Sequence, residues 1–193
     1  MITACEFGDI NMREVDFALA KSCSYMKFDY KIADMNELRL IWEKNIADNP
    51  GDPRWPIWRD IYIGYNEKQM ATTFIVAADG VPVGEGTLIQ SPECGAAIGR
   101  PEIADGHSVA NVNALRIDKR FEGQHHISRL VRMLEEYARQ LGYSRVTIGV
   151  EAKEARNLAI YLHWGYTRLV SYYIEDDDSR LKKSKNPIGT VLY

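Results

Sequence analysis

The chain has 193 residues, of which 46% are hydrophobic and 26% are charged, and its formal net charge is −3. This length and composition fit an ordinary soluble globular domain that can bury a sizeable core. The pI near 5.8 argues against nucleic acid as the main partner, because binding to a phosphate backbone needs a dense positive surface.

The cysteines and the hydropathy pattern indicate the compartment. Cys5, Cys23 and Cys94 are scattered and form no CxxC pair, which favours free thiols in a reducing environment. No apolar run approaches the roughly 18 residues of a membrane-spanning helix, and the N-terminus has no secretory pattern. We therefore expect a cytoplasmic protein that has no membrane partner.

Residues 1–25 hold only a weak amphipathic segment, so we expect an N-terminal extension there and one domain over residues 26–193. The domain begins with a predicted strand at 27–32. Asp34 and Glu37 have the spacing of a capping box, which predicts a helix over 35–46. After a loop rich in Asp, Asn, Pro and Gly, an aromatic-rich helix is predicted near 54–66.

A β-hairpin is predicted next, with strands at 72–78 and 81–90, because Asp79-Gly80 between them is a strong turn pair. Residues 91–106 are rich in Gly, Pro, Ala and Ser and predict a long connection. A further strand is predicted at 109–117.

The clearest periodic pattern predicts a helix over 127–140, with Gly142 in the position that follows a helix end. Its outer face offers ion pairs four residues apart, Arg132–Glu136 and Glu135–Arg139. A strand at 145–150, a helix at 156–164, a strand at 166–174 and the start of a closing strand at 190–193 follow. This order predicts an α/β fold with a sheet of mixed direction.

Three segments carry a resemblance to a known family. Glu122-Gly123-Gln124-His125-His126-Ile127 precedes the long helix, Asn113–Ile117 is a predicted strand, and Asn157–Tyr166 contains Tyr161 followed by Gly165-Tyr166. These segments resemble the GNAT superfamily of N-acyltransferases, which use acetyl groups carried on coenzyme A. Of the family's Arg/Gln-Gly-x-Gly-x-Gly/Ala turn, only Gly123 agrees. The resemblance covers about residues 26–193 and implies a mixed, mostly antiparallel central sheet flanked by helices.

The resemblance also implies acetyl-CoA as the co-substrate. A turn that presents backbone N–H groups at a helix start suits its phosphates. Histidine tolerates a positive φ better than most residues, whereas Ile127 should have helical dihedral angles. Arg120, Arg129 and the two histidines would add positive charge there. The cofactor-binding residues implied are Leu115, Arg116, Ile117, Gly123, Gln124, His125, His126, Ile127, Ser128 and Asn157.

For catalysis, the resemblance implies that Tyr161 protonates the leaving thiolate and that a backbone N–H near Ala114–Leu115 polarises the thioester carbonyl. Glu85 is the candidate general base, because Gly84 and Gly86 beside it would let its side chain reach a cleft unobstructed. A solvated strand carboxylate, His107 as the base, or proton loss through water are the alternatives.

No metal is expected, because the adjacent His125 and His126 rarely ligate one ion together and no third ligand lies at a suitable spacing. Trp55, Trp58 and Tyr62 either pack a helix on the sheet or line the acceptor pocket. In the second case, with Asp52, Asp60 and Glu85 nearby, they would suit a cationic amine.

Together these features predict an N-acetyltransferase that moves an acetyl group from acetyl-CoA directly to a primary amine of a small molecule. No cysteine is placed for a covalent intermediate, since Cys94 falls in the long connection. A catalytically silent coenzyme A-binding or regulatory module of the same fold is the alternative, and acylation of protein lysines or N-termini is a third. The oligomeric state is left open, with a homodimer as one option.

Overall fold

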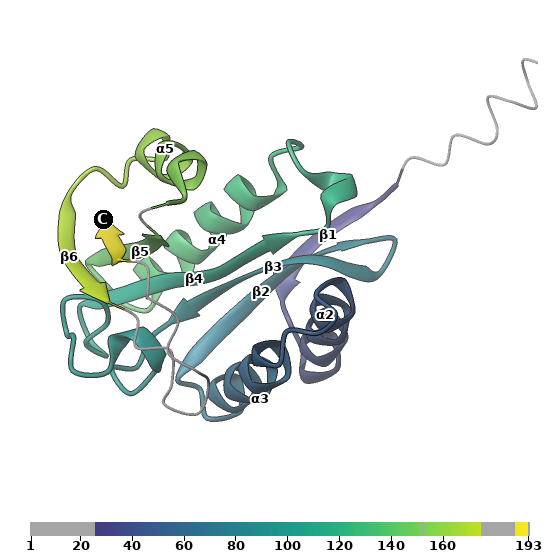
Figure 1. Ribbon diagram of the computed structural model, residues 1–193, viewed down its shortest axis with the longest axis horizontal. Coiled ribbons are helices and arrows are strands. Elements are labelled where there is room, and N and C mark those ends of the chain that lie inside the picture. The colour runs from purple at the N-terminus through teal and green to yellow at the C-terminus, as the bar shows by residue number, and fades with distance from the viewer. Residues whose placement is uncertain (1–25, 152, 175–187, 193) are drawn as a thin grey trace, which may run out of the picture.

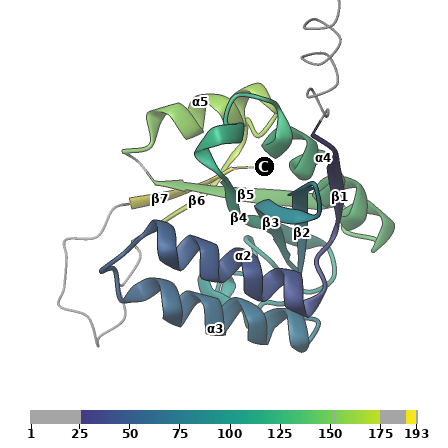
Figure 2. The ribbon, with the colours of Figure 1, turned by 90° about the vertical axis from the view of Figure 1, so that its right-hand side faces the viewer.

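A computed structural model describes residues 26–151, 153–174 and 188–192 of the chain. Within this part, seven strands form one sheet in the order β1-β2-β3-β4-β5-β7-β6. Helices α2 and α3 cover one face, and α4 and α5 lie on the other (Figures 1 and 2). Only β4 and β5 pair in parallel, so the predicted mixed, mostly antiparallel sheet between helices is confirmed.

The observed elements follow the predicted order with small shifts at their ends. The strands are β1 (Phe28–Ile32), β2 (Ala71–Ala78), β3 (Val81–Ile89), β4 (Val109–Ile117), β5 (Arg145–Glu151), β6 (Leu169–Ile174) and β7 (Ile188–Leu192). The helices are α2 (Met35–Asp48), α3 (Arg54–Glu67), α4 (His126–Gln140) and α5 (Ala155–His163), with 3-10 turns at Gly95–Ala97 and Lys119–Phe121. The predicted extension at residues 1–25 and Tyr193 lie outside the described residues. None of the described helices has the length and apolarity that crossing a membrane requires.

Helix α2 begins as its sequence predicts. The Asp34 side chain accepts hydrogen bonds from the backbone N–H groups of Asn36 and Glu37, and the Glu37 carboxylate accepts one from the Asp34 N–H. This satisfies N–H groups that a helix start otherwise leaves unpaired. The helix then buries Leu38, Ile41 and Trp42 against aromatic residues of α3.

Helix α4 supplies the apolar layer on the other face of the sheet. Leu130, Val131, Leu134 and Ala138 are buried in the main core cluster. Gly142 follows the helix end with a φ of 90°, as its position predicts.

The ion pairs predicted on the outer face of α4 are wrong. Glu136 pairs with Arg139, three residues away, instead of with Arg132. Glu135 accepts a hydrogen bond from the Tyr166 hydroxyl at 2.8 Å. Surface ion pairs are weak, so a contact with another element readily replaces them.

The strand β4 leaves its parallel neighbour half way along its length. It pairs with β5 only from Val109 to Val112. Its pairing with β3 shifts register between Glu85 and Thr87, and Ala114 opposite this shift has a φ of 51°. A bulge of this kind bends a strand. The second half of β4 therefore diverges from β5, and the edge of β4 that faces β5 is not paired with it there.

Gly84 and Gly86 provide room for side chains of β4 on the α4 face of the sheet. A Cβ atom on Gly84 would lie 2.5 Å from Ile117 Cδ1 and 2.9 Å from the Arg116 carbonyl oxygen. A Cβ atom on Gly86 would lie 2.8 Å from Leu115 Cδ2. The two glycines thus let β3 and β4 pack closely beside the bulge. They do not open a path for Glu85, whose side chain lies on the opposite face.

We predict that Gly84→Ala lowers the free energy of unfolding by about 1–3 kcal/mol, because the new methyl group meets a backbone oxygen that cannot move alone. Gly64→Ala is the matched control: nothing lies within 4 Å of its added Cβ in α3. It should stabilise the protein by about 0.5–1 kcal/mol. Urea denaturation measures both, and equal effects of the two substitutions would contradict the prediction.

Candidate functional site

The turn before α4 presents a row of unused backbone donors. Within the described part of the chain, the N–H groups of residues 123–128 donate no backbone hydrogen bond; the first helical bond runs from the Arg129 N–H to the His125 carbonyl. His125, the residue before the helix, makes no capping side-chain bond. Donors of this kind at a helix N-terminus attract phosphate oxygens, helped by the helix dipole.

The dihedral angles explain how this turn forms with few glycines. Gly123 has a φ of 74°, and His125 has φ 64° and ψ 12°, in the left-handed region. Histidine occupies that region at moderate cost. Ile127 lies inside α4, and its φ is not positive, so the sequence prediction for both residues is confirmed.

The side chains around the turn contribute less charge than predicted. His126 is buried, with its ring 4.3 Å from the ring of Phe28 and its Nδ1 2.6 Å from the Tyr30 hydroxyl. Burial, followed by the nearby Arg129, lowers the pKa of His126, which therefore stays neutral at pH 7. Arg120 is held by Asp118. The prediction that the His126 side chain adds positive charge is therefore wrong, because this side chain belongs to the core beside β1.

The Tyr161 side chain lies on α5 and packs against the main core cluster. It is half-buried, its ring centre is 5.7 Å from that of Trp164, and its hydroxyl forms no hydrogen bond with any described residue. Burial, and secondarily Glu154, raises the pKa of Tyr161. The phenol is therefore protonated at neutral pH, as a proton donor must be. Asn157, one turn earlier, donates to Glu154 at 2.6 Å.

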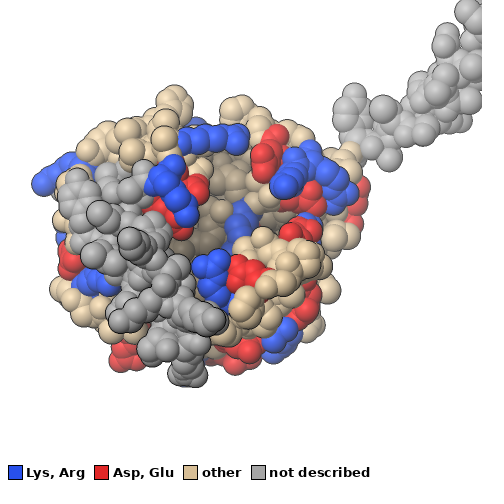
Figure 3. Space-filling model, in the orientation of Figure 1, with Lys and Arg blue, Asp and Glu red and all other residues tan. Residues whose placement is uncertain are grey.

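A cleft of about 700 Å³ opens on the α2–α3 side of the sheet, beside the end of β4. Figure 3 shows a hollow near the middle of one face, with both basic and acidic side chains on its rim. Residues of α2, Trp55 of α3, Arg116 to Arg120 and Glu122 line the cleft. Leu115 packs against the core cluster on the opposite, α4 face, and Ile117 contacts both that cluster and the cleft.

Glu85 lies beneath this cleft and is fully buried. Its Oε1 accepts hydrogen bonds from Asn45 Nδ2 at 2.7 Å and from Arg116 Nε at 2.9 Å. Burial raises the pKa of Glu85, while Arg116 and Asn45 act in the opposite direction. The expectation that Glu85 reaches an open cleft is wrong, because α2 covers it. Its role as a general base stays a prediction.

The sequence did not predict the hydrogen-bonding partners of Glu85. Asn45 is buried although it is polar, and Trp42 and Trp55 stack near the guanidinium group of Arg116, at 4.3 Å and 5.1 Å from its Cζ atom. An asparagine on the buried face of an amphipathic helix is the one available signal, because such a group needs a hydrogen-bonding partner.

The other candidates for the acceptor site are dispersed. Asp52 pairs with Arg54, and the exposed Asp60 pairs with Arg59, so neither carboxylate is left for a cationic amine. Trp58 and Tyr62 pack against the cluster of Leu38, Ile41 and Trp42, as the core-packing alternative predicts, whereas Trp55 both packs there and lines the cleft.

His107 lies just before β4 begins and is largely exposed. It is paired with Asp105 and sits at the opposite end of the strand from the Arg116 segment. No group of three or more His, Cys, Asp or Glu side chains within the described ranges is arranged to hold a metal ion.

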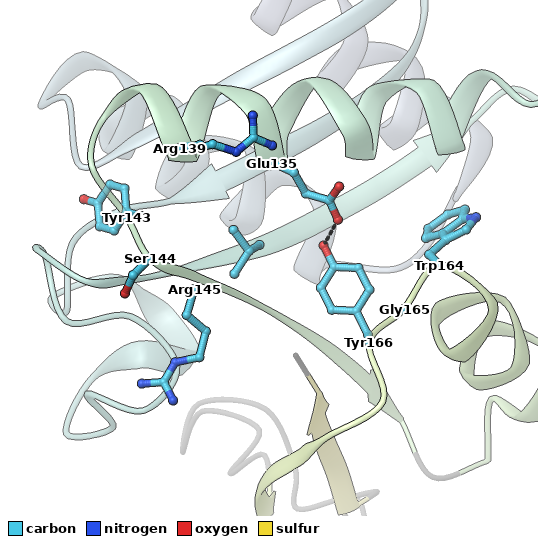
Figure 4. A pocket seen from close by; sticks show the side chains of 9 residues that line it. Glu135, Arg139, Tyr143, Ser144, Arg145, Trp164, Gly165 and Tyr166 are labelled. Atoms are coloured by element: carbon cyan, nitrogen blue, oxygen red, sulfur yellow. Dashed lines mark hydrogen bonds between the residues drawn. The ribbon is translucent and has the colours of Figure 1, made fainter.

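A second, smaller hollow of about 440 Å³ lies between the C-terminal half of α4 and the turn after α5 (Figure 4). The hydrogen bond from Tyr166 to Glu135 crosses it and ties this turn to α4. It contains none of the predicted site residues. The Tyr166–Glu135 bond thus holds the turn that follows α5, the helix that carries Tyr161.

Comparisons with known proteins agree with this geometry. The model of the acetyltransferase (GNAT) family matches residues 35–166. A putative acetyltransferase from Salmonella typhimurium, solved with its cofactor acetyl-CoA, is similar with a TM-score of 0.60 at 14% identity, covering 86% of this chain and 92% of that one. A Trypanosoma brucei acetyltransferase has a TM-score of 0.54 at 16% identity, covering 74% and 94%. No curated protein matches the sequence significantly.

We predict that His125→Val lowers the free energy of unfolding by about 1–2 kcal/mol, because a β-branched residue is strained at positive φ. His125→Gly should be as stable as the natural protein or slightly more so. Gln124→Val, at an exposed neighbour whose φ is not positive, is the control and should have little effect. Thermal unfolding followed by circular dichroism measures all three, and a His125→Val protein as stable as the control would show that the turn has another conformation.

Proposed function

This chain belongs to the GNAT family of acetyltransferases, and we propose that it transfers an acetyl group from acetyl-CoA to a primary amine of a small molecule. The observation that carries this proposal is the row of unused N–H groups at residues 123–128, beside the diverging second half of β4. The residues present fit coenzyme A at this place. The phosphates need backbone donors and a helix dipole, which the turn provides without the usual glycines.

The co-substrate supplies an activated acetyl group in thioester linkage, and the protein has to orient and polarise it. Ala114 and Leu115 fall in the bulge of β4, outside the pairing with β3, and the Ala114 N–H is already bound by the Asn113 side chain at 2.7 Å. We assign the Leu115 N–H as the donor to the thioester carbonyl. A fixed backbone donor at this point stabilises the negative charge that develops on the oxygen.

Tyr161 is the proposed proton donor to the leaving thiolate. The amine nitrogen forms the new bond to the acetyl carbon, the carbon–sulfur bond breaks, and the sulfur receives the Tyr161 proton, while the nitrogen loses its proton to water or a base. The raised pKa keeps the phenol protonated until that step. Glu85 remains a candidate base, but its buried carboxylate is bound by Arg116 and Asn45 and does not line the cleft.

A small acceptor is favoured over a protein by the shape of the acceptor side. The cleft beside Arg116 is walled by α2 and by Trp55, and its 700 Å³ suit a compact molecule. Among the structural neighbours is a glucosamine-6-phosphate N-acetyltransferase from Arabidopsis thaliana, with a TM-score of 0.57 at 11% identity. Identity at that level shows the fold alone, and so the proposal of a small acceptor rests on the size and walls of the cleft.

We predict that the protein binds acetyl-CoA and releases coenzyme A thiol when a suitable amine is added. Isothermal titration calorimetry measures the first step, and a thiol-reactive dye measures the second with a panel of small primary amines and a lysine peptide. An absence of binding at millimolar acetyl-CoA would contradict the co-substrate assignment. Thiol release with the peptide but with no small amine would replace the proposed acceptor by a protein.

Tyr161→Phe should lower kcat by about 10²- to 10⁴-fold and leave the KM for acetyl-CoA nearly unchanged, because only the proton donor is lost. Since burial raises the pKa of Tyr161, any alkaline decline of the rate that comes from loss of its proton should begin at a higher pH than for an ordinary tyrosine. Tyr137→Phe, on α4 against Phe74, is the control and should leave kcat unaffected. An unchanged kcat in Tyr161→Phe would remove Tyr161 from the mechanism.

A further inference from the structure

We propose that Arg116 binds an anionic group, a carboxylate or a phosphate, on the amine that the enzyme acetylates. The inference rests on the proposed function and names the class of acceptor: a small molecule that carries both an amine and an anion. It depends on the side chain of Arg116, which points into the α2–α3 cleft, and not on the β4 backbone that serves acetyl-CoA.

The guanidinium group of Arg116 is held in one orientation before any ligand arrives. Its Nε donates to Glu85 Oε1 at 2.9 Å, and its Cζ lies 4.3 Å from the ring centre of Trp42 and 5.1 Å from that of Trp55. A planar cation fixed by one ion pair and two aromatic rings loses little conformational entropy on binding. Arg116 is thus prepared for a further hydrogen-bonding partner.

The two terminal nitrogens of Arg116, Nη1 and Nη2, form no hydrogen bond with a described residue. Among the described residues, only its Nε forms a hydrogen bond, and Nη2 is buried without one. The side chain as a whole is 24% exposed and lines the cleft. Nη2 lies inside the protein, as does the unpartnered Oε2 of Glu85, so a ligand does not reach it. Nη1 is neither buried nor hydrogen-bonded to a described residue, and it is the nitrogen that can donate to an oxygen of a carboxylate or phosphate in the cleft.

The remaining charges of the cleft are largely paired with one another. Lys44 pairs with Asp48 and Asp118, and Arg120 pairs with Asp118, whose pKa these contacts lower well below its ordinary value. Lys119 and Glu122, both exposed at the rim, form no ion pair within the described residues. Arg116 differs from Lys119 because its guanidinium group is held in place by Glu85, Trp42 and Trp55.

Glu85 acts here as a positioning residue. Its Oε1 receives both Asn45 and Arg116, which links α2 to β3 and β4 under the cleft. Because Glu85 is fully buried, a ligand reaches Arg116 from the cleft side and does not compete for the same edge of the guanidinium group. The burial of Glu85 then has a function apart from proton transfer.

The experiment compares amines that differ only in the anion. We would measure kcat/KM of the full chain for β-alanine against β-alaninamide and for phosphoethanolamine against ethanolamine. The natural enzyme should prefer the anionic member of at least one pair by about 10- to 100-fold, the range of a charge-assisted hydrogen bond. The pair that responds tells a carboxylate from a phosphate. Equal use of both members of each pair would overturn the proposal.

The substitutions test whether Arg116 causes this preference. Arg116→Met should abolish it and Arg116→Lys should keep part of it, whereas Arg39→Met, which removes a cation from the exposed part of α2, should preserve it. Because Arg116→Met leaves Glu85 buried without its partner, the double variant Glu85→Gln/Arg116→Gln provides a second, uncharged pair. An undiminished preference in a folded double variant would refute the proposal.

Binding without turnover separates this proposal from the proposed function. Tryptophan fluorescence should change when β-alanine or phosphoethanolamine is titrated into the natural protein, because Trp42 and Trp55 lie beside Arg116. The change should be absent in Arg116→Met. Acetyl-CoA binding without any Arg116-dependent response to either probe would refute the anionic acceptor alone. A response to a probe without acetyl-CoA binding would instead refute the proposed transfer reaction.

Discussion

The departure of β4 from β5 after Val112 is the constraint on which the rest of the site depends. Ala114 adopts a positive φ at a cost of about 1 kcal/mol or more, since its Cβ approaches the following carbonyl. The bulge at this residue bends the strand, and beyond Val112 the edge of β4 is not paired with β5. Gly84 and Gly86 allow the bend, because larger residues would collide with Ile117 and Leu115. The close packing of β3 on β4 and the opening of the site therefore come from the same few residues.

The turn before α4 lacks most glycines of the family motif, but its backbone can still present N–H groups to a phosphate. The groups that suit a phosphate are backbone N–H groups, whose directions depend on dihedral angles and not on residue type. Gly123 and His125 take the two left-handed positions, and His126 enters the core against Phe28. Two adjacent histidines thus differ completely in their environments: one accepts an unusual backbone conformation, and the other provides a neutral aromatic ring.

On the other face of the sheet, burial determines what Glu85 and Arg116 can bind. Glu85 has no exposed surface and binds Arg116 and Asn45, so the acid that the sequence offers as a base belongs to a buried network. Burial of such a pair under α2 and aromatic rings is tolerated because the two groups are hydrogen-bonded to each other. The same network holds the guanidinium group toward the cleft. The proposed contact with an anion thus depends on one cation held in place and not on the acidic residues near α3, which pair locally.

The sequence by itself determined the order of the elements, the mixed sheet, the capping box at Asp34, the hairpin turn at Asp79-Gly80 and the positions of Tyr161 and of the turn before α4. These features are local, since they depend on residues a few positions apart. Only the tertiary structure decided which face Glu85 occupies, that Arg116 is its partner, and that Glu135 binds Tyr166 instead of Arg139. Those contacts join residues about thirty positions apart in the chain, at distances that the sheet register and helix packing fix. Hydrophobic periodicity predicts that a face is buried, but not which polar group meets which across the layers.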